Sequence, residues 1–313
     1  MSHIYHGLDE VPPGFGPSVV AIGNFDGVHR GHQEILRTVI CEARTRSARA
    51  VAITFDPHPD IVLRPARAPQ ILTPMDQRAR LLLETGIDAV VVLPFDLELA
   101  KLSAREFLER VVVRTLGAIG VHEGENFRFG HKAEAGVTEL ASFGEEYGFS
   151  VTVHKPVCVR GLEVSSSAVR ALVGEGDMAR ARWMLGRPFG IRGTPKHDRG
   201  IGSRLLVPTV NLAPYAGQLP AFGVYVTQLT IGNRIFRAVS NIGVRPTFEG
   251  AGFSVESHIL DFEPVDLDDA TPLYLEFLFH LRAEQKFATT DDLRAQIMKD
   301  VQRAQRYFRR AGP

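Results

Sequence analysis

The chain has 313 residues, of which 44% are hydrophobic, and its 36 basic side chains balance 36 acidic ones. This length favours two domains, because a single core seldom grows beyond about 250 to 300 residues. The balanced charge, with no long run of one sign, argues against a protein that binds nucleic acid or a membrane surface through bulk charge.

The cysteines and the apolar segments exclude further classes of protein. Only Cys41 and Cys158 occur, far apart and without a metal-ligand pattern nearby, so neither a disulfide framework nor a zinc site is indicated. The N-terminal residues are polar, and no apolar stretch approaches the ~20 residues of a membrane span. We therefore expect a soluble, cytoplasmic protein without membrane partners. The sequence leaves the oligomeric state open, a homo-oligomer included.

A turn rich in glycine and histidine follows the first predicted strand. The apolar run at residues 18–22 leads into GNFDGVHRGH, from Gly23 to His32, and apolar residues then recur at helical spacing over residues 35–40. The pattern predicts a strand, a tight turn and an amphipathic helix. Gly23 and Gly27 allow the backbone of the turn to approach a ligand closely.

This turn is typical of a site for a phosphate group. Backbone N–H groups at the start of a helix lack intrahelical partners and favour an anion. His29 and His32 are three residues apart, so they share a face of the first turn and add donors. The pattern differs from both the Walker GxxxxGK[ST] and the dinucleotide GxGxxG motifs. The residues that we assign to the cradle besides the histidines are Gly23, Asn24, Phe25, Asp26 and Gly27.

Strands and helices alternate through the rest of the first half. Apolar runs predict strands at 50–55, 89–95, 118–122 and 149–154, and helical patterns lie at 76–85 and 103–116. Alternation of this kind predicts an α/β doubly wound, Rossmann-like domain, whose ligands lie beyond the carboxyl ends of the strands.

Polar segments follow three of these strands. His58 lies in Asp56-Pro-His-Pro59, where the prolines alone would explain a stiff turn, and Asn126 lies in a loop with aromatic neighbours that suit ordinary packing. The segment after the fifth strand leads into a short helix that carries Arg170 and is predicted to end at Gly174. Its serines are Ser165, Ser166 and Ser167, residues that commonly cap helices.

The pattern changes near residues 185–188, where short β-runs replace helices. Strands are predicted at 189–192, 207–212, 223–231, 234–241, 254–261 and 273–281, with Gly232-Asn233 as a tight hairpin turn. Many short strands in about 95 residues suggest a closed, Greek-key-type β-barrel. A C-terminal helix from Thr290, acidic at its start and basic at its end, completes this domain.

The motifs of the first half resemble those of a known enzyme family. HxGH is the signature of the nucleotidyltransferase superfamily, and the fuller GxFDGxHxGH resembles the bacterial bifunctional riboflavin kinase/FAD synthetases. In that family the loop that contains Asn126 has the form GxDF or GxNF, and an ISSTxIR motif matches residues 164–170, with Ser167 in place of Thr.

The second half resembles the kinase part of the same family over most of its length. The matching segments, in order, are PTVN at 208–211, GVY at 223–225, NIGVRPTF at 241–248, VESH at 255–258 and LRAEQKF at 281–287. The resemblance therefore covers nearly the whole chain. It implies an FMN adenylyltransferase domain at residues 1–186 and a riboflavin kinase domain at 187–313.

The resemblance implies two consecutive reactions that use small-molecule substrates. Riboflavin and ATP give FMN, then FMN and a second ATP give FAD and pyrophosphate, with Mg²⁺ in both. The adenylyl transfer needs no side-chain base, because the phosphate of FMN is already anionic. We therefore assign His29, His32 and Arg170 to stabilisation of the phosphates, and His58, Asn126 and the serine segment to nucleotide binding.

The kinase reaction requires a carboxylate that accepts the proton of the attacking hydroxyl. Glu256 is the candidate, although an ordinary solvated strand glutamate is the alternative. Thr209 and Asn211 alternate on one strand face and offer oxygens to a magnesium-bound phosphate.

One departure from the family pattern keeps a second hypothesis open. The kinase motif HGxGRGxxLGFPTAN reads HDRGIGSRLLVPTVN at residues 197–211, so that Asp198 and Leu206 replace glycines. A monofunctional FAD synthetase with a degenerate kinase domain is therefore the alternative. A flavin-binding regulatory protein is a third hypothesis, which the intact histidines and Arg170 disfavour.

Overall fold

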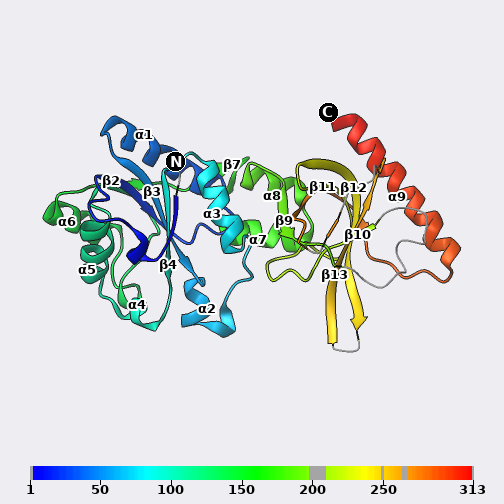
Figure 1. The fold of residues 1–313 in the computed structure, drawn as a ribbon, viewed down its shortest axis with the longest axis horizontal. Helices are drawn as coiled ribbons and strands as arrows, with labels where there is room; N and C mark the ends of the chain where they lie inside the picture. The colour runs from blue at the N-terminus through cyan, green and yellow to red at the C-terminus, as the bar shows by residue number, and fades with distance from the viewer. Residues whose placement is uncertain (1–2, 197–208, 248–249, 263–266, 269, 312–313) are drawn as a thin grey trace. The chain divides into compact units, whose positions relative to one another are not determined.

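The computed structural model describes residues 3–196, 209–247, 250–262, 267–268 and 270–311 (Figure 1). It consists of two compact units, residues 1–166 and 167–313. This division lies earlier than the functional boundary at residues 186 and 187, which stays a prediction. The altered kinase motif at residues 197–208 lies outside the described residues. No helix in the part of the chain that the structure describes is long and apolar enough to cross a membrane.

The first unit contains a six-stranded sheet in which all neighbouring strands are parallel. Its strands are β1 (His3–His6), β2 (Ser18–Ile22), β3 (Arg49–Asp56), β4 (Ala89–Pro94), β5 (Ala118–Gly124) and β6 (Ser150–His154). They lie in the order β1-β4-β3-β2-β5-β6. This is the doubly wound, Rossmann-like arrangement predicted from the sequence, with β1 as an additional edge strand. The direction of the winding reverses between β2 and β5.

Helices cover both faces of this sheet (Figure 1). They are α1 (Arg30–Thr45), α2 (Pro59–Leu63), α3 (Met75–Glu84), α4 (Leu97–Lys101), α5 (Ala104–Phe107), the π-helical η3 (Leu108–Thr115) and α6 (Val137–Tyr147). Val19 and Ala21 of β2 pack with α1 and α3, whereas Val20 and Ile22 pack with α5, η3 and α6. Because successive strand side chains point to opposite faces, a continuous apolar run is buried on both.

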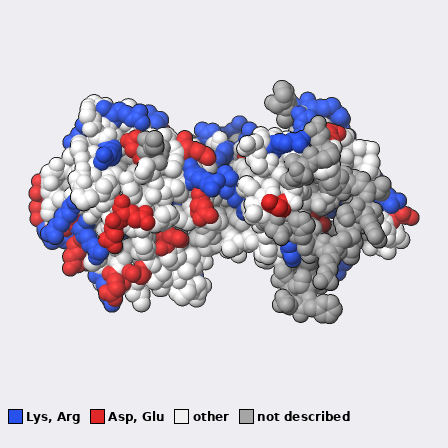
Figure 2. All heavy atoms as spheres, viewed as in Figure 1, with Lys and Arg blue, Asp and Glu red and all other residues white. Residues whose placement is uncertain are grey.

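Basic and acidic side chains are interspersed on the face of the first unit that Figure 2 shows. Exposed ion pairs one helical turn apart occur in the first unit, such as Glu34 with Arg37 and Glu98 with Lys101. Such exposed pairs contribute little to stability, because solvent screens the two charges, and their main effect is a mixed surface charge.

The second unit contains an antiparallel sheet of six strands. They are β9 (Phe189–Gly193), β10 (Thr209–Asn211), β11 (Gly223–Ile231), β12 (Arg234–Thr247), β13 (Gly250–Ile259) and β14 (Leu273–Ala283), in the order β10-β13-β12-β11-β14-β9. The placement of β10 beside β13 makes β10 to β13 a Greek key. The sheet curls into a half-barrel, and a bridge between Pro195 and Leu212 joins its two edges. The predicted strands are confirmed, although β12 and β14 extend beyond their predicted ends and β13 both begins and ends earlier than expected.

Helices precede and follow this sheet. The structure places α7 at Ser166–Glu175, α8 at Met178–Leu185 and α9 at Thr290–Ala311, together with a small hairpin of β7 (Cys158–Val159) and β8 (Leu162–Glu163) in the first unit. The prediction that α7 ends at Gly174 is wrong by one residue, and Gly176, at φ +78°, follows it. Ala304 and Phe308 of α9 pack against Val224 and Val226, and a buried pair between Arg282 and Asp300, at 2.9 Å, fixes the helix to β14.

Candidate functional site

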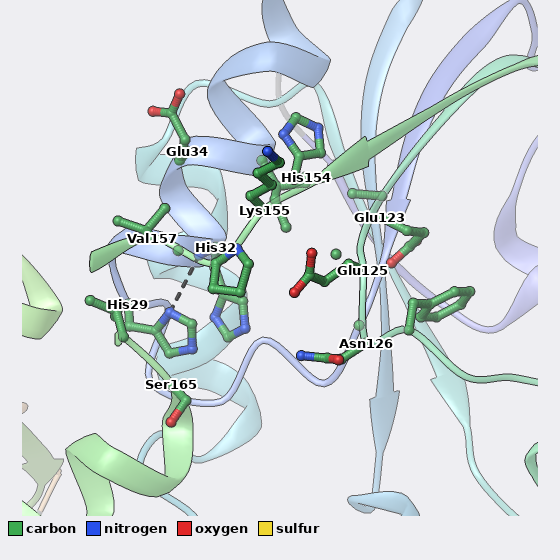
Figure 3. A pocket seen from close by; sticks show the side chains of 18 of the residues that line it. His29, His32, Glu34, Glu123, Glu125, Asn126, His154, Lys155, Val157 and Ser165 are labelled. Carbon is green, nitrogen blue, oxygen red and sulfur yellow. Dashed lines mark hydrogen bonds between the residues drawn. The ribbon is translucent and has the colours of Figure 1, made fainter. Parts of the chain in front are cut away.

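A pocket of about 280 Å³ lies in the first unit at the carboxyl ends of β2, β5 and β6 (Figure 3). It therefore lies where the direction of winding reverses, the usual position for a nucleotide in an open α/β sheet. Several sequence-predicted residues line it together, although they are distant in the chain. These are Gly23, Phe25, His29, His32, Asn126 and Ser165.

His29 is the N-cap of α1, which begins at the next residue. Its Nδ1 accepts a hydrogen bond from the backbone N–H of His32 at 3.4 Å, so this nitrogen is unprotonated and the proton resides on Nε2. The rings of His29 and His32 are stacked, with centroids 3.6 Å apart. A Cβ at Gly31 would lie 3.1 Å from His29 Nδ1, which explains the glycine between them. The turn therefore holds an N–H donor beside the helix start.

His32 is a neutral side chain at physiological pH. Burial is the main reason that the pKa of His32 lies well below its usual value, and the positive charge of Arg78 lowers it further. Its ring packs edge-on against Phe25, with centroids 5.1 Å apart. Its Nδ1 is buried and has no hydrogen-bond partner among the described residues. An unsatisfied buried nitrogen of this kind is expected at a ligand site.

The turn that precedes α1 has a strained backbone that other segments hold in place. Phe25 and Val28 have positive φ values, +47° and +40°, which cost non-glycine residues on the order of 1 kcal/mol or more. Asp26 is buried, and its carboxylate accepts hydrogen bonds from the backbone N–H groups of Leu72 and Thr73, at 3.0 and 2.9 Å. Asp26 is thus directed at the protein, and it is not among the residues that line the pocket.

Arg78 of α3 supports the same turn from within the core. Only 2% of its surface is exposed. Its guanidinium donates to the backbone oxygens of Asn24, Phe55 and Thr73, at 3.0, 3.2 and 3.3 Å. These bonds connect the turn to the end of β3 and to the start of α3. Sequence reasoning missed this residue, because an arginine within a helical pattern normally suggests an exposed face.

His58 and Asn24 contact each other and do not line the pocket. His58 is buried and caps α2, its Nδ1 accepting from the N–H of Asp60 at 3.2 Å. Its Nε2 lies 3.1 Å from the side-chain amide nitrogen of Asn24. The 58–73 segment is thus attached to the turn at both ends, through His58 at one and through Leu72 and Thr73 at the other.

The serine segment contributes one residue to the pocket and one to the turn. Ser165 lines the pocket, and the hydroxyl of Ser166 donates to the backbone oxygen of Asp26 at 2.8 Å. Ser167 and Arg170 belong to α7 in the second unit, so their position relative to the pocket stays a prediction.

Glu123, at the end of β5, lines the pocket but was not predicted from the sequence. It is buried, and its Oε1 accepts from the backbone N–H of Ile22 at 2.7 Å. Burial raises the pKa of Glu123 well above its usual value, against the opposing effect of this hydrogen bond. A protonated Glu123 would not repel the phosphates of a nucleotide.

The raised pKa of Glu123 predicts a dependence of stability on pH. The folded protein holds this proton more tightly than the unfolded chain, so the stabilisation is fully present below the unfolded pKa, near 4.5, and is lost as pH rises through the folded pKa. In Glu123→Gln the amide oxygen still accepts from Ile22 and nothing ionises. We therefore expect Glu123→Gln to raise the urea midpoint above that of the native protein by more at pH 8 than at pH 5.

The control for this measurement is Glu98→Gln, which neutralises a carboxylate that is 80% exposed. It should show no such difference between the two pH values. An equal effect of Glu123→Gln on the urea midpoint at pH 5 and pH 8 would contradict the proton assignment.

A second group of predicted residues meets on one face of the β-sheet in the second unit. Glu256 of β13 lies opposite Asn211 of β10 on one side and Asn241 of β12 on the other, and Thr209 lies opposite His258. Directly opposed residues of antiparallel strands share a face, so these side chains are neighbours. Asn211 Oδ1 is buried without a hydrogen-bond partner among the described residues. Among the described residues no group of three or more His, Cys, Asp or Glu could hold a metal.

The first unit thus has the fold and pocket of a nucleotide-binding α/β protein, and the second is a Greek-key β-domain with a polar cluster. Family models match both parts of the chain: FAD synthetase at residues 13–168 and riboflavin kinase at 185–308. The chain therefore belongs to the bifunctional riboflavin kinase/FMN adenylyltransferase family.

Individual relatives resemble the chain over nearly its whole length. The bifunctional riboflavin kinase/FMN adenylyltransferase of Escherichia coli (strain K12) is 34% identical, covering 97% of this chain and 96% of that protein. That of Pseudomonas fluorescens is 37% identical and covers 95% of each. A crystal structure described as a macrolide-efflux protein from Streptococcus pneumoniae superposes with a TM-score of 0.87 at 27% identity, covering 97% of this chain and 99% of that one.

Proposed function

We propose that this protein phosphorylates riboflavin with ATP to give FMN and then transfers the adenylyl group of a second ATP to FMN, giving FAD and pyrophosphate. The observation that carries this proposal is the match of both family models, one to each part of a chain whose relatives have both activities in their names. One similar structure is described as an efflux protein, but no feature described above favours a transport function for this protein.

For the adenylyl transfer, we propose that ATP occupies the pocket with its phosphates at the turn before α1. The Nε2–H of His29, the ring of His32 and the backbone N–H groups at the helix start would stabilise charge on the α-phosphate and the leaving pyrophosphate. Arg170 would complete this set, and Asn126 and Ser165 would contact the nucleotide. The attacking phosphate of FMN is anionic, so the residues supply position and charge.

For the kinase step, we propose that the carboxylate of Glu256 orients the terminal hydroxyl of riboflavin and accepts its proton as the γ-phosphorus is attacked. Asn211 would bind Mg²⁺ or its phosphate ligand through the Oδ1 that has no described partner, and Thr209 would add a second oxygen. Mg²⁺ supplies positive charge to the transferred phosphate. We assign the adenylyltransferase to residues 1–186 and the kinase to 187–313, both acting in the cytoplasm.

Incubation of the purified protein with riboflavin and MgATP, followed by chromatographic separation of the flavins, tests the proposal. We expect FMN to appear first and FAD to follow. If riboflavin stays unphosphorylated at millimolar MgATP while added FMN is converted to FAD, the kinase half of the proposal is wrong. The protein would then be a monofunctional FAD synthetase. Omission of magnesium is expected to stop both reactions.

A further inference from the structure

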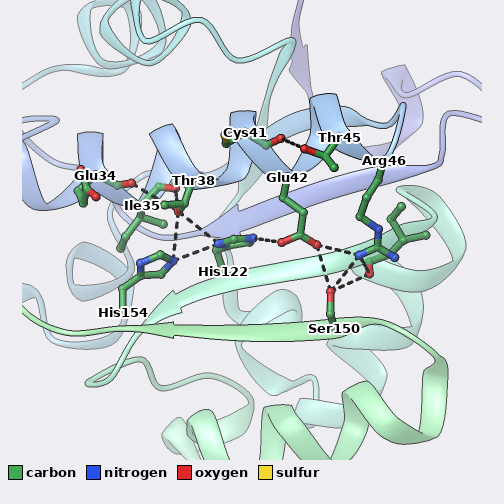
Figure 4. Close-up of polar contacts among 11 residues, drawn as sticks. Glu34, Ile35, Thr38, Cys41, Glu42, Thr45, Arg46, His122, Ser150 and His154 are labelled. Atoms are coloured by element: carbon green, nitrogen blue, oxygen red, sulfur yellow. Dashed lines mark hydrogen bonds and ion pairs between the residues drawn. The ribbon is translucent and has the colours of Figure 1, made fainter.

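A chain of hydrogen bonds runs from α1 to the wall of the pocket across β5 and β6 (Figure 4). Glu42 Oε2 lies 2.7 Å from His122 Nε2, and His122 Nδ1 lies 3.0 Å from His154 Nε2. Thr38 Oγ1 lies 3.3 Å from His122 Nδ1 and 3.3 Å from His154 Nε2. His122 is only 3% exposed, whereas His154 lines the pocket. The adenylyl transfer described above makes no use of this chain.

The partners of Glu42 determine the direction of these hydrogen bonds. Burial alone would raise the pKa of Glu42, but hydrogen bonds from Arg46, His122 and Ser150 outweigh it and lower the pKa, so Glu42 is ionised. A carboxylate only accepts, so His122 Nε2 carries a proton, and the neutral ring then offers a lone pair at Nδ1. Thr38 donates to the backbone oxygen of Ile35 at 2.7 Å, so it cannot supply a proton here.

His154 must therefore donate its Nε2–H to His122. Burial lowers the pKa of His154 against the opposing effect of Glu34, so the ring is neutral at pH 7. A neutral imidazole has one proton. Its Nδ1 is consequently a hydrogen-bond acceptor, held in that state by Glu42 and His122, which do not line the pocket.

We propose that His154 recognises the base of the bound nucleotide by accepting a hydrogen bond from the 6-amino group of adenine, and that Glu42 and His122 are positioning residues that fix its tautomer. The inference rests on the proposed use of this pocket by ATP. His29 and His32 would hold the phosphates, and His154 lines another part of the same pocket, from β6. An acceptor at this place selects an amino group over the 6-oxo group of hypoxanthine or guanine.

The first test compares ATP with inosine triphosphate (ITP), whose base has an oxygen at position 6. In His154→Ala we expect kcat/KM for ATP in nucleotidyl transfer to FMN to fall about 10-fold, and that for ITP to change less than about 2-fold. His6→Ala, a change of an exposed histidine on β1, is the control and should leave both values unchanged. Equal losses with the two nucleotides would overturn the assignment to the base.

The second test reverses the tautomer. In Glu42→Gln, Arg46 can only donate, so the amide oxygen must face Arg46 at the position of Oε1 and the amide N–H must face His122. His122 would then be protonated on Nδ1 and donate to His154, which would carry its own proton on Nδ1. His154 then becomes a donor at Nδ1. We expect the ratio of kcat/KM for ATP to that for ITP to fall more than about 10-fold, with an absolute gain for ITP.

Nitrogen-15 NMR of the histidine rings provides a measurement that needs no catalysis. The native protein should show His154 protonated on Nε2, and Glu42→Gln should show it protonated on Nδ1. Glu98→Gln is the matched control. If the network is merely structural, Glu42→Gln should change the melting temperature without changing the ratio of kcat/KM for ATP to that for ITP. If the tautomer of His154 reverses and this ratio does not change, the proposal is overturned.

Two further outcomes separate this inference from the proposed function. The native protein can also be assayed with 2′-deoxy-ATP. If it loses as much activity with 2′-deoxy-ATP as His154→Ala loses with ATP, and does not do so with ITP, His154 contacts the ribose and the base assignment is wrong. If the native protein transfers no nucleotide to FMN, the proposed function fails. Binding of ATP and ITP measured by calorimetry still tests the selectivity of His154 in that case.

Discussion

Replacement of His29 by alanine is expected to stop the formation of FAD while FMN accumulates from riboflavin. The substitution removes both the cap of α1 and the Nε2–H donor beside the helix start. Loss of one donor to a developing anion typically costs about 10²- to 10³-fold in rate. Separate assays with riboflavin and with FMN as substrate measure the two steps, and chemical denaturation of the variant controls for the folding of the first unit.

Glu256→Gln is expected to give the reverse result. The amide occupies the same place between Asn211 and Asn241 but cannot accept the proton, so FMN formation should fall about 10²- to 10⁴-fold. Added FMN should still be converted to FAD. Loss of both steps in either folded variant would contradict the assignment of the two reactions to different residues.

Arg78→Met is expected to lower the free energy of unfolding of the first unit by about 3 kcal/mol. The change leaves the buried backbone oxygens of Asn24, Phe55 and Thr73 without the guanidinium that they bind, and each hydrogen bond to a charged group contributes about 1.5 to 3 kcal/mol before relaxation. Because the turn before α1 loses its support, FAD synthesis should fall as well. Chemical denaturation and the FMN assay measure the two effects.

The control for Arg78→Met lies two residues further along the same helix. Arg80→Met makes the same chemical change at an exposed position and should alter stability by less than about 0.5 kcal/mol. A loss of less than 1 kcal/mol in Arg78→Met would show that water or neighbouring groups replace the guanidinium.

The sheet of the first unit was predictable because burial on both faces leaves a direct mark on the sequence. The runs that became β2 and β4 are apolar without interruption, and the second unit was predictable from its turns, such as Gly232-Asn233. By contrast, β1 was missed. It has only four residues, and two of them are exposed histidines. It pairs with β4, which is distant in the chain, so the residues around β1 do not indicate this pairing. The helix α6 was also missed. It contains Gly144, a residue that disfavours a helix and that packs here against Phe149.

The candidate site was predictable where a motif concentrates its residues and less so where the fold assembles them. His29, His32, Asn126 and Ser165 come from motifs and line one pocket. Glu123 and His154, together with Arg78 behind the turn, were missed, because their environment depends on which strands and helices are neighbours. A glutamate at the end of an otherwise apolar strand is the one signal that could have indicated Glu123. Asp26 and Ser166, which we assigned to nucleotide binding, make hydrogen bonds within the protein, and their contact with a ligand stays a prediction.

The attachment of the 58–73 segment at both ends has a consequence for limited proteolysis. Arg67 is exposed near the middle of the segment and precedes Ala68, so trypsin can reach a cleavable bond there. A cut at this bond would leave Asn24, Asp26 and His58 on one fragment and Leu72 and Thr73 on the other. His58 would stay in contact with Asn24, and the hydrogen bonds from Leu72 and Thr73 to Asp26 would join the two fragments. The nicked chain should therefore remain associated without denaturant, and separate into two bands only in detergent.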